Sequence, residues 1–310
     1  MGVTMGTGDI LAVVQEKGGV GKTTTAINLG AWYGRLGYRT LLIDLDPQGN
    51  LARGLAVTPP QGTMYRVLRD PAFSMAEAIV ATDVPNVDLA PADASLEAAE
   101  IELIQALSRE SVLRRKLEAG AVRQRYERVI IDCRPSLGVL TVNAMVAADR
   151  LLIPVETQYF AIEALQTLLD VVRMVQETLH RGLRIAGIVP TKHEPRVRVC
   201  QVTLGLLRER YPHLLTATVI RKYVAFAEAQ LRGLPIYAVA DGTDASEAYR
   251  ALALELDGAP VTPATGEPRH WAPAVAAPQH APIDGRDRRA GRSARGEGQI
   301  RQAALPLERG

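Results

Sequence analysis

The sequence predicts an α/β protein with a mostly parallel, twisted sheet flanked by helices. Two observations support this fold class. From Ile10 onward, short apolar runs alternate with longer segments of helical period, which is typical of strand–helix units around a parallel sheet. Runs such as VIID and LLIP show no alternation of apolar and polar residues, as expected for strands that helices cover on both faces.

Six short apolar runs are the predicted strands. They read ILAVV, TLLID, VDLA, RVIID, RLLIP and IAGIV, at residues 10–14, 40–44, 87–90, 128–132, 150–154 and 185–189. The segments between and after them carry apolar residues at helical spacing. They predict helices at residues 22–36, 95–117, 140–148, 162–179, 199–210 and 245–256.

The composition is ordinary for a soluble protein. The chain has 310 residues, of which 47% are hydrophobic and 23% charged, and its formal net charge of +2 demands no nucleic-acid partner. Cys133 and Cys200 belong to no CxxC pair or Cys/His cluster, which predicts two buried thiols in a reducing cytoplasm. No signal peptide or run of eighteen apolar residues is present, so we expect a cytoplasmic protein that does not span a membrane.

A change of composition after about Asp257 predicts the domain boundary. Residues 1–257 form the folded domain, and residues 258–310 are rich in Pro, Ala, Gly and Arg without periodicity, which predicts a disordered tail. Five arginines at positions 286, 288, 289, 292 and 295 make part of the tail basic, although three acids dilute the charge. The tail is either a solvated appendage or a weak electrostatic contact with nucleic acid or an acidic partner.

The segment KGGVGKTT follows an apolar strand and opens a helix. Glycines allow backbone N–H groups to turn toward phosphate oxygens, and the helix directs its N-terminus at the same anion. Lys22 is expected to reach the β and γ phosphates, and the Thr23 hydroxyl to contact Mg²⁺. This pattern predicts a P-loop NTPase. The nucleotide-binding residues are Lys17, Gly18, Gly19, Val20, Gly21, Lys22, Thr23 and Thr24.

This loop resembles the deviant Walker A motif of the ParA and MinD ATPases. The ordinary motif needs glycine at position 16, where Glu16 stands, and an additional lysine, Lys17, comes before the first glycine instead. The resemblance implies that Lys17 crosses a dimer interface to the partner's nucleotide, so that two subunits enclose two ATP molecules. A cation supplied in trans would stabilise charge on the transferred phosphoryl group, which couples hydrolysis to association.

Carboxylates follow two of the predicted strands, where ligands bind in an open α/β sheet. The segment DLDPQGN, with Asp44 and Asp46, is similar to the switch segment of ParA proteins, and Asp132 to their second acidic motif. The resemblance implies that Asp46 positions the attacking water and contributes to the metal site with Thr23 and Asp132. It places Asp44 at the strand end and in the metal's outer shell. Slow ATP hydrolysis with Lys17, Lys22 and Asp46 as catalytic residues is therefore expected.

The resemblance covers residues 10–256 and includes TTTAINLG, PSLGVLTVNA, IPVETQYFAIEAL and SEAYRALALEL. It is to the short, Soj-like type, with no helix-turn-helix domain before the loop. Two departures stand out. Arg134 replaces a usual proline, which places a bulky cation on the nucleotide side or its rim. IRKYVA at residues 220–225 replaces the usual IPRNVR, which leaves the adenine and DNA contacts of this loop open.

Members of this group bind either nonspecific DNA or a membrane. Prolines at positions 263, 268, 273, 278 and 282 interrupt any amphipathic helix in the tail, so no membrane partner is expected. Basic residues in two loop regions are the candidate phosphate contacts of DNA. They are Lys192, Arg196, Arg198, Arg221 and Lys222.

The resemblance predicts a cytoplasmic, nucleoid-associated ATPase that segregates chromosomes or plasmids, with ATP and Mg²⁺ as cofactors. It would form an ATP-dependent homodimer, bind nonspecific DNA, and be released when a ParB-like or other cargo adaptor stimulates hydrolysis. Three alternatives stay open: positioning of a non-DNA cargo, a nucleotide-dependent electron carrier similar to the nitrogenase iron protein, and a regulator that barely turns over. The sequence identifies neither the cargo, the replicon nor the partner.

Overall fold

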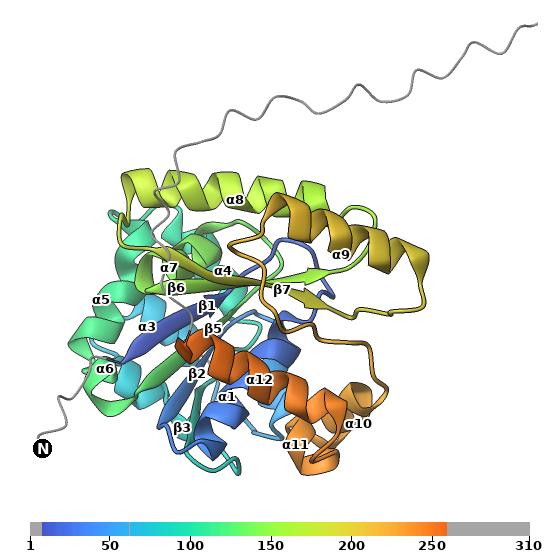
Figure 1. Ribbon diagram of the computed structural model, residues 1–310. Coiled ribbons are helices and arrows are strands. Elements are labelled where there is room, and N and C mark those ends of the chain that lie inside the picture. Colours follow the sequence, from blue (N-terminus) through green and yellow to red (C-terminus); the bar gives the residue numbers. More distant parts are fainter. Residues whose placement is uncertain (1–7, 62, 259–310) are drawn as a thin grey trace, which may run out of the picture. The chain divides into compact units, whose positions relative to one another are not determined.

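The computed structural model describes residues 8–61 and 63–258 (Figure 1). These residues contain one sheet of seven strands in the order β3-β4-β2-β5-β1-β6-β7. All neighbours are parallel except β3, which is antiparallel to β4 at the edge. The strands are β1 (Asp9–Val13), β2 (Thr40–Leu45), β3 (Val80–Ala81), β4 (Val87–Ala90), β5 (Arg128–Cys133), β6 (Arg150–Glu156) and β7 (Arg184–Thr191).

All six predicted strands are confirmed, as is the parallel, helix-flanked fold class. The short β3 was not predicted, because two residues leave no apolar run to recognise. The predicted tail at residues 258–310 lies outside the described residues, apart from Gly258. None of the helices in the described ranges combines the length and apolar character that a membrane span requires.

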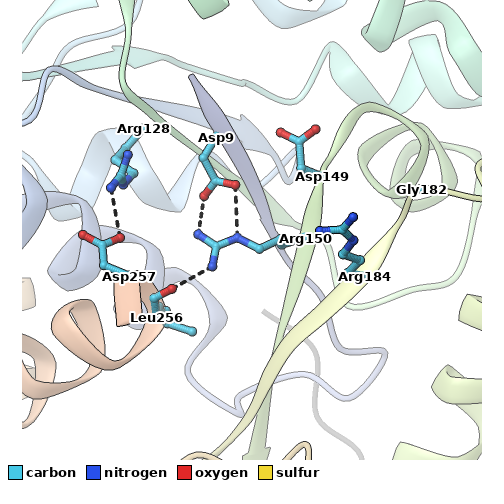
Figure 2. Close-up of a pocket in the computed structure, with 8 residues that line it drawn as sticks. All are labelled: Asp9, Arg128, Asp149, Arg150, Gly182, Arg184, Leu256 and Asp257. Carbon is cyan, nitrogen blue, oxygen red and sulfur yellow. Dashed lines mark hydrogen bonds and ion pairs between the residues drawn. The ribbon is translucent and has the colours of Figure 1, made fainter. Parts of the chain in front are cut away.

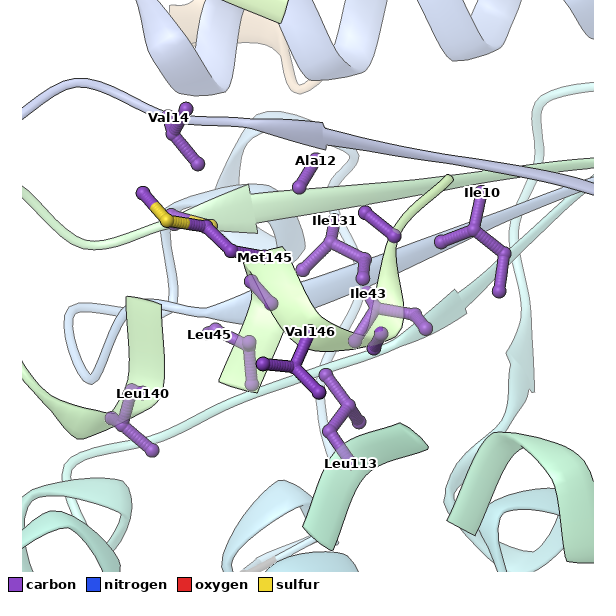
Figure 3. Packing of buried hydrophobic residues seen from close by; sticks show 14 of the residues in the cluster. Ile10, Ala12, Val14, Ile43, Leu45, Leu113, Ile131, Leu140, Met145 and Val146 are labelled. Atoms are coloured by element: carbon purple, nitrogen blue, oxygen red, sulfur yellow. The ribbon is translucent and has the colours of Figure 1, made fainter. Parts of the chain in front are cut away.

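The central strands are buried on both faces. In β1, Ile10 and Ala12 contact one apolar core, whereas Leu11 and Val13 contact the other. Figure 3 shows part of the first core, where residues of β1, β2 and β5 meet α7 side chains such as Met145. This double burial is the physical reason why these strands read as continuous apolar runs.

Helices cover the two faces of the sheet. The helices with residues in the second core are α1 (Lys22–Arg35), α2 (Asn50–Gly54), α10 (Ala225–Arg232), α11 (Ile236–Val239) and α12 (Asp244–Gly258). The helices with residues in the first core are α3 (Thr63–Arg69), α4 (Leu96–Leu103), α5 (Val112–Ala119), α6 (Val122–Arg125), α7 (Val139–Ala147), α8 (Ala161–Thr178) and α9 (Arg198–Arg210), with the 3₁₀ turns η1 (Met75–Ala78) and η2 (Arg109–Ser111) nearby.

The single helix predicted at residues 95–117 is wrong. The chain breaks between α4 and α5, where Ser108 has a left-handed φ of 51°. Asn143 of α7 stabilises the break: its amide donates to the Arg109 carbonyl at 2.7 Å and its carbonyl accepts the Leu113 N–H at 3.1 Å. Hydrogen bonds to a distant helix thus replace those within a single helix, and the local sequence pattern does not indicate them.

Ion pairs lie at the amino-terminal ends of the central strands β1, β5 and β6. Figure 2 shows Arg150 between both oxygens of Asp9 and the Leu256 carbonyl, to which it donates at 2.7 Å. Arg128 pairs with Asp257 at 3.0 Å beside it. These residues line a cavity of about 410 Å³. The contacts hold the C-terminal end of α12 against β1, β5 and β6.

We expect an Arg150→Ala protein to lose about 2–3 kcal/mol of unfolding free energy, because Asp9 and the Leu256 carbonyl lose a charged donor that is largely buried. Urea unfolding measures this change. Arg184→Ala is the matched control: Arg184 lines the same cavity, but its side chain makes no hydrogen bond or ion pair with the described residues, so its effect should stay within about 0.5 kcal/mol. Equal losses in the two variants would contradict the ion-pair role.

Candidate nucleotide-binding site

The loop between β1 and α1 forms a cradle of backbone N–H groups. Gly19 and Gly21 have φ angles of 75° and 93°, a region that side-chain-bearing residues rarely adopt. Gly21 is the N-cap of α1, and no side chain caps that helix. The first N–H groups of α1 are therefore available to an anion, as the sequence predicts.

Lys22 lies buried between this loop and the strand-end carboxylates. Its side chain is 7% exposed, and its Nζ donates to the Lys17 carbonyl at 3.3 Å. Burial lowers its pKa, while the nearby Asp132, Cys133 and Asp46 act in the opposite direction. A buried ammonium at the first residue of the helix is suited to hold phosphate oxygens.

Asp132 is a buried carboxylate near the end of β5. Its side chain is fully buried, and neither oxygen has a hydrogen-bond partner among the described residues. Burial raises its pKa to about 7, and the Thr23 hydroxyl and the Lys22 ammonium oppose this shift. A buried carboxylate without a hydrogen bond of good geometry calls for a cation, and the Thr23 hydroxyl and the Lys22 ammonium lie near enough to lower its pKa.

The Asp44 carboxylate accepts hydrogen bonds from the switch loop. It is directly opposite Asp132 in the pairing of β2 and β5. Its two oxygens accept the backbone N–H groups of Asp46 at 2.9 Å and Leu51 at 3.1 Å. Asp44 sits at the strand end as predicted, and its carboxylate holds the switch loop through these two hydrogen bonds. Its expected place in the metal's outer shell stays a prediction. Burial raises the pKa of Asp44 well above its usual range.

Asp46 lies on the switch loop and faces the cavity in front of the P-loop. Its side chain is 8% exposed, and one oxygen accepts the Gln48 N–H at 3.0 Å. The other oxygen has no described hydrogen bond to protein. Asp46 is therefore held in orientation and keeps one acceptor oxygen without a hydrogen bond to the described residues, in a side chain that lines the cavity.

The cavity itself has a volume of about 580 Å³, within the range of small-molecule sites. The phosphate cradle forms one end, together with Asp46 and Pro135. Residues of the loop after β7 and of α10 form the other end. Thr191 of β7 joins the two: its hydroxyl donates to the Val20 carbonyl at 2.8 Å.

The residues present fit a magnesium ion bound together with nucleotide phosphates. No group of three or more His, Cys, Asp or Glu side chains within the described ranges could hold a metal alone. Mg²⁺ in nucleotide sites needs only one or two protein ligands beside phosphates and water. Thr23, Asp46 and Asp132 are the residues that would supply these oxygens.

Comparisons with known proteins agree with this geometry. The family described as AAA domain matches residues 8–185. The chain is 41% identical to the sporulation initiation inhibitor protein Soj of Bacillus subtilis, over 80% of this chain and 98% of that protein. It is also 41% identical to the chromosome partitioning protein ParA of Caulobacter vibrioides, over 80% of this chain and 93% of that protein.

The chain belongs to the ParA family. It is a ParA-like ATPase, and ATP and Mg²⁺ are its cofactors, as predicted. Among solved structures, it is similar to a cobyrinic acid a,c-diamide synthase from Mycobacterium smegmatis with bound ADP and magnesium. The identity is 32%, the TM-score 0.69, and the match covers 79% of this chain and 92% of that one.

The lysine specific to the ParA-type loop does not line its own cavity. The Lys17 Nζ donates to the Gln158 Oε1 at 3.3 Å, on the turn before α8. Gln158 in turn donates to Glu156 at 2.8 Å. The side chain therefore leans outward from the P-loop, whereas Lys22 points inward.

Arg134, expected on the nucleotide side or its rim, does not line the cavity. Arg134 forms an ion pair with Glu100 of α4, which turns its guanidinium away, and Pro135 lines the cavity instead. Glu100 neutralises the cation that replaces the usual proline of the ParA family. The sequence predicts that Glu100 lies in a helix, but it does not indicate that Glu100 pairs with Arg134.

The five candidate DNA-binding residues are all exposed, but they divide into two groups. Hydrogen bonds from the His193 N–H to the Ile220 carbonyl and from the Lys222 N–H to the His193 carbonyl join their loops, at 3.1 and 3.2 Å. The cavity-lining group is Lys192, Arg221 and Lys222; the group outside the cavity is Arg196 and Arg198. Lys222 also pairs with Glu194 at 3.0 Å.

Sequence reasoning missed the residues of the far end of the cavity. They are Thr191, Phe226, Ala227, Gln230 and Tyr249, besides the already noted loop at residues 220–225. Tyr249 lies in the predicted helix at residues 245–256 and α10 was not predicted. Only the departure from the family pattern at residues 220–225 pointed to this region.

Proposed function

We propose that this ParA-family ATPase segregates DNA, either a chromosome or a plasmid, in the cytoplasm at the nucleoid. ATP binding would bring two copies together, and the dimer would bind DNA without sequence preference. A ParB-like or other cargo adaptor would stimulate hydrolysis and release. The observation that carries the proposal is the outward Lys17, which does not line its own cavity and would reach a second subunit's phosphates by giving up its hydrogen bond to Gln158.

The chemistry follows from the inward residues. The Lys22 ammonium would bind the β and γ phosphates, and Asp46 would hold the attacking water through its free oxygen. Thr23, Asp46 and Asp132 would hold Mg²⁺, which neutralises charge on the phosphates when bound. Among the described residues, no histidine lines the cavity, which suits slow turnover.

The alternatives from other classes receive less support. Cys133 lies on β5 in the first core, and Cys200 is buried on α9, so neither thiol is placed to bridge a cluster between two subunits. This disfavours the electron carrier. A non-DNA cargo is compatible with the same ATPase cycle, and a regulator with little turnover conflicts with the placement of Asp46. Residues 1–257 would carry the ATPase cycle and residues 258–310 a separate tail.

We expect binding to random-sequence duplex DNA with ATP, and not with ADP or without nucleotide. The Arg196→Ala/Arg198→Ala protein should bind at least about tenfold more weakly, with a salt dependence reduced by about two counterions, because both side chains are exposed outside the cavity. Fluorescence anisotropy at several salt concentrations measures this.

Arg181→Ala, an exposed arginine in the turn after α8, is the matched control and should bind DNA as the parent protein does. Absence of DNA binding under every condition, with ATP-driven dimers confirmed by light scattering, would contradict the DNA surface but not the ATPase cycle. Absence of ATP binding would contradict both.

A further inference from the structure

The end of the cavity remote from the P-loop has walls of aromatic side chains. Tyr223 precedes α10, and Phe226 and Gln230 stand one turn apart on it, so both project from the same face of the helix into the cavity. The rings of Tyr223 and Phe226 are 6.2 Å apart at 59°. Flat apolar walls of this kind suit the faces of a purine base.

The aromatic wall is fixed to the helix that carries the phosphate cradle. Phe226 packs edge-on against Tyr249, with ring centroids 5.7 Å apart. The Tyr249 hydroxyl shares a hydrogen bond with Thr25 of α1 at 3.3 Å. Asn28, also in α1, accepts the Ile236 N–H at 2.7 Å just beyond α10. The wall and the cradle therefore keep a constant separation.

The C-terminal end of α10 is held as firmly. Gly233 ends the helix with a left-handed φ of 64°. A Cβ at this position would lie 2.6 to 3.0 Å from atoms of Ala56, in the segment after α2. This close packing, together with the contacts to α1, prevents α10 from sliding along the cavity.

Gln230 is the side-chain carboxamide that the described residues place at this end of the cavity. Its carboxamide makes no hydrogen bond to any described residue, although the side chain lines the cavity. We infer that the Gln230 carboxamide reads the edge of the adenine base, accepting from the N6 amino group and donating to N1, while Tyr223 and Phe226 contact the ring face. This inference rests on the proposed ATP site and adds the residue that recognises the base.

A Gln230→Glu exchange tests the assignment because it changes donor to acceptor at nearly constant shape. A carboxylate would accept from the adenine N6 but repel the N1 lone pair, whereas guanine offers two donors, N1–H and the N2 amino group. The ratio of ATP to GTP affinity should fall at least about tenfold. Gln230→Met, which removes both functions, should weaken ATP and GTP about equally. Calorimetry of the full chain with magnesium and each nucleotide measures these affinities.

Two controls separate base recognition from general effects. Leu231→Glu places the same charge one residue further, at an 88% exposed position that does not line the cavity, and should leave the ATP to GTP ratio unchanged. Affinity for magnesium tripolyphosphate, which has no base, should be the same in all variants. A ratio unchanged within about twofold in Gln230→Glu would overturn the inference while leaving the ATP site intact. Failure of the parent protein to bind any nucleotide would overturn the proposed function and this inference together.

Discussion

Replacing Lys17 with alanine is expected to abolish the ATP-dependent dimer and to lower ATP turnover at least about 100-fold, because the cation supplied in trans is lost. The affinity of the monomer for ATP should stay within about threefold of the parent value, because Lys17 does not line its own cavity. Light scattering with ATP gives the oligomeric state, and phosphate release gives turnover.

Lys22→Ala is the contrasting variant on the same loop. Lys22 is buried inside the cradle, so its loss should weaken ATP binding itself at least about 30-fold, and dimerisation would fail for that reason. Both variants should lose turnover, so the affinity for ATP is the measurement that distinguishes the roles of the two lysines. A Lys17→Ala protein with full dimerisation and turnover would remove the principal support for an ATP-sandwich dimer.

The phosphate end of the site could be predicted because its chemistry depends on contiguous residues. Glycines at positions 19 and 21 adopt backbone angles that only glycine tolerates well, so the loop leaves a recognisable pattern. The strands were equally predictable, since burial on both faces forces uninterrupted apolar runs such as those of β1 and β5.

The base end could not be predicted, because its parts are joined only by tertiary contacts. Tyr249 is aligned by Thr25, which is 224 positions away, and Gln230 belongs to a helix of eight residues without a strong pattern. Arg134 and Glu100 illustrate the same limit: both residues are ordinary in sequence, and neither indicates that they form an ion pair outside the lining of the cavity. Asp44 and Asp46 look alike in sequence but differ in their hydrogen bonds. Both Asp44 oxygens accept backbone N–H groups, whereas only one Asp46 oxygen does.

Asp46→Asn is expected to lower ATP turnover about 100- to 1,000-fold while the ATP affinity and the ATP-dependent dimer persist. The Asp46 side chain lines the cavity and has one oxygen without a hydrogen bond to the described residues, and an amide of the same shape would hold the attacking water without accepting a proton from it. The variant should accumulate on DNA, because hydrolysis no longer ends the bound state. Single-turnover phosphate release, measured beside DNA-bound protein, separates chemistry from binding.

Asp44→Asn provides the matched control, two residues earlier and of the same chemistry. Because both Asp44 oxygens accept backbone N–H groups in a fully buried position, the exchange replaces one acceptor with a donor facing a donor. Its expected effect is a loss of about 1–3 kcal/mol of unfolding free energy. Turnover should fall only because the switch loop loses the two hydrogen bonds that hold it. Asp46→Asn should leave the unfolding free energy within about 0.5 kcal/mol of the parent value. If Asp46→Asn instead turned over ATP normally, the water would be positioned by another group, and Asp132, the remaining unpartnered carboxylate, would be the first to test.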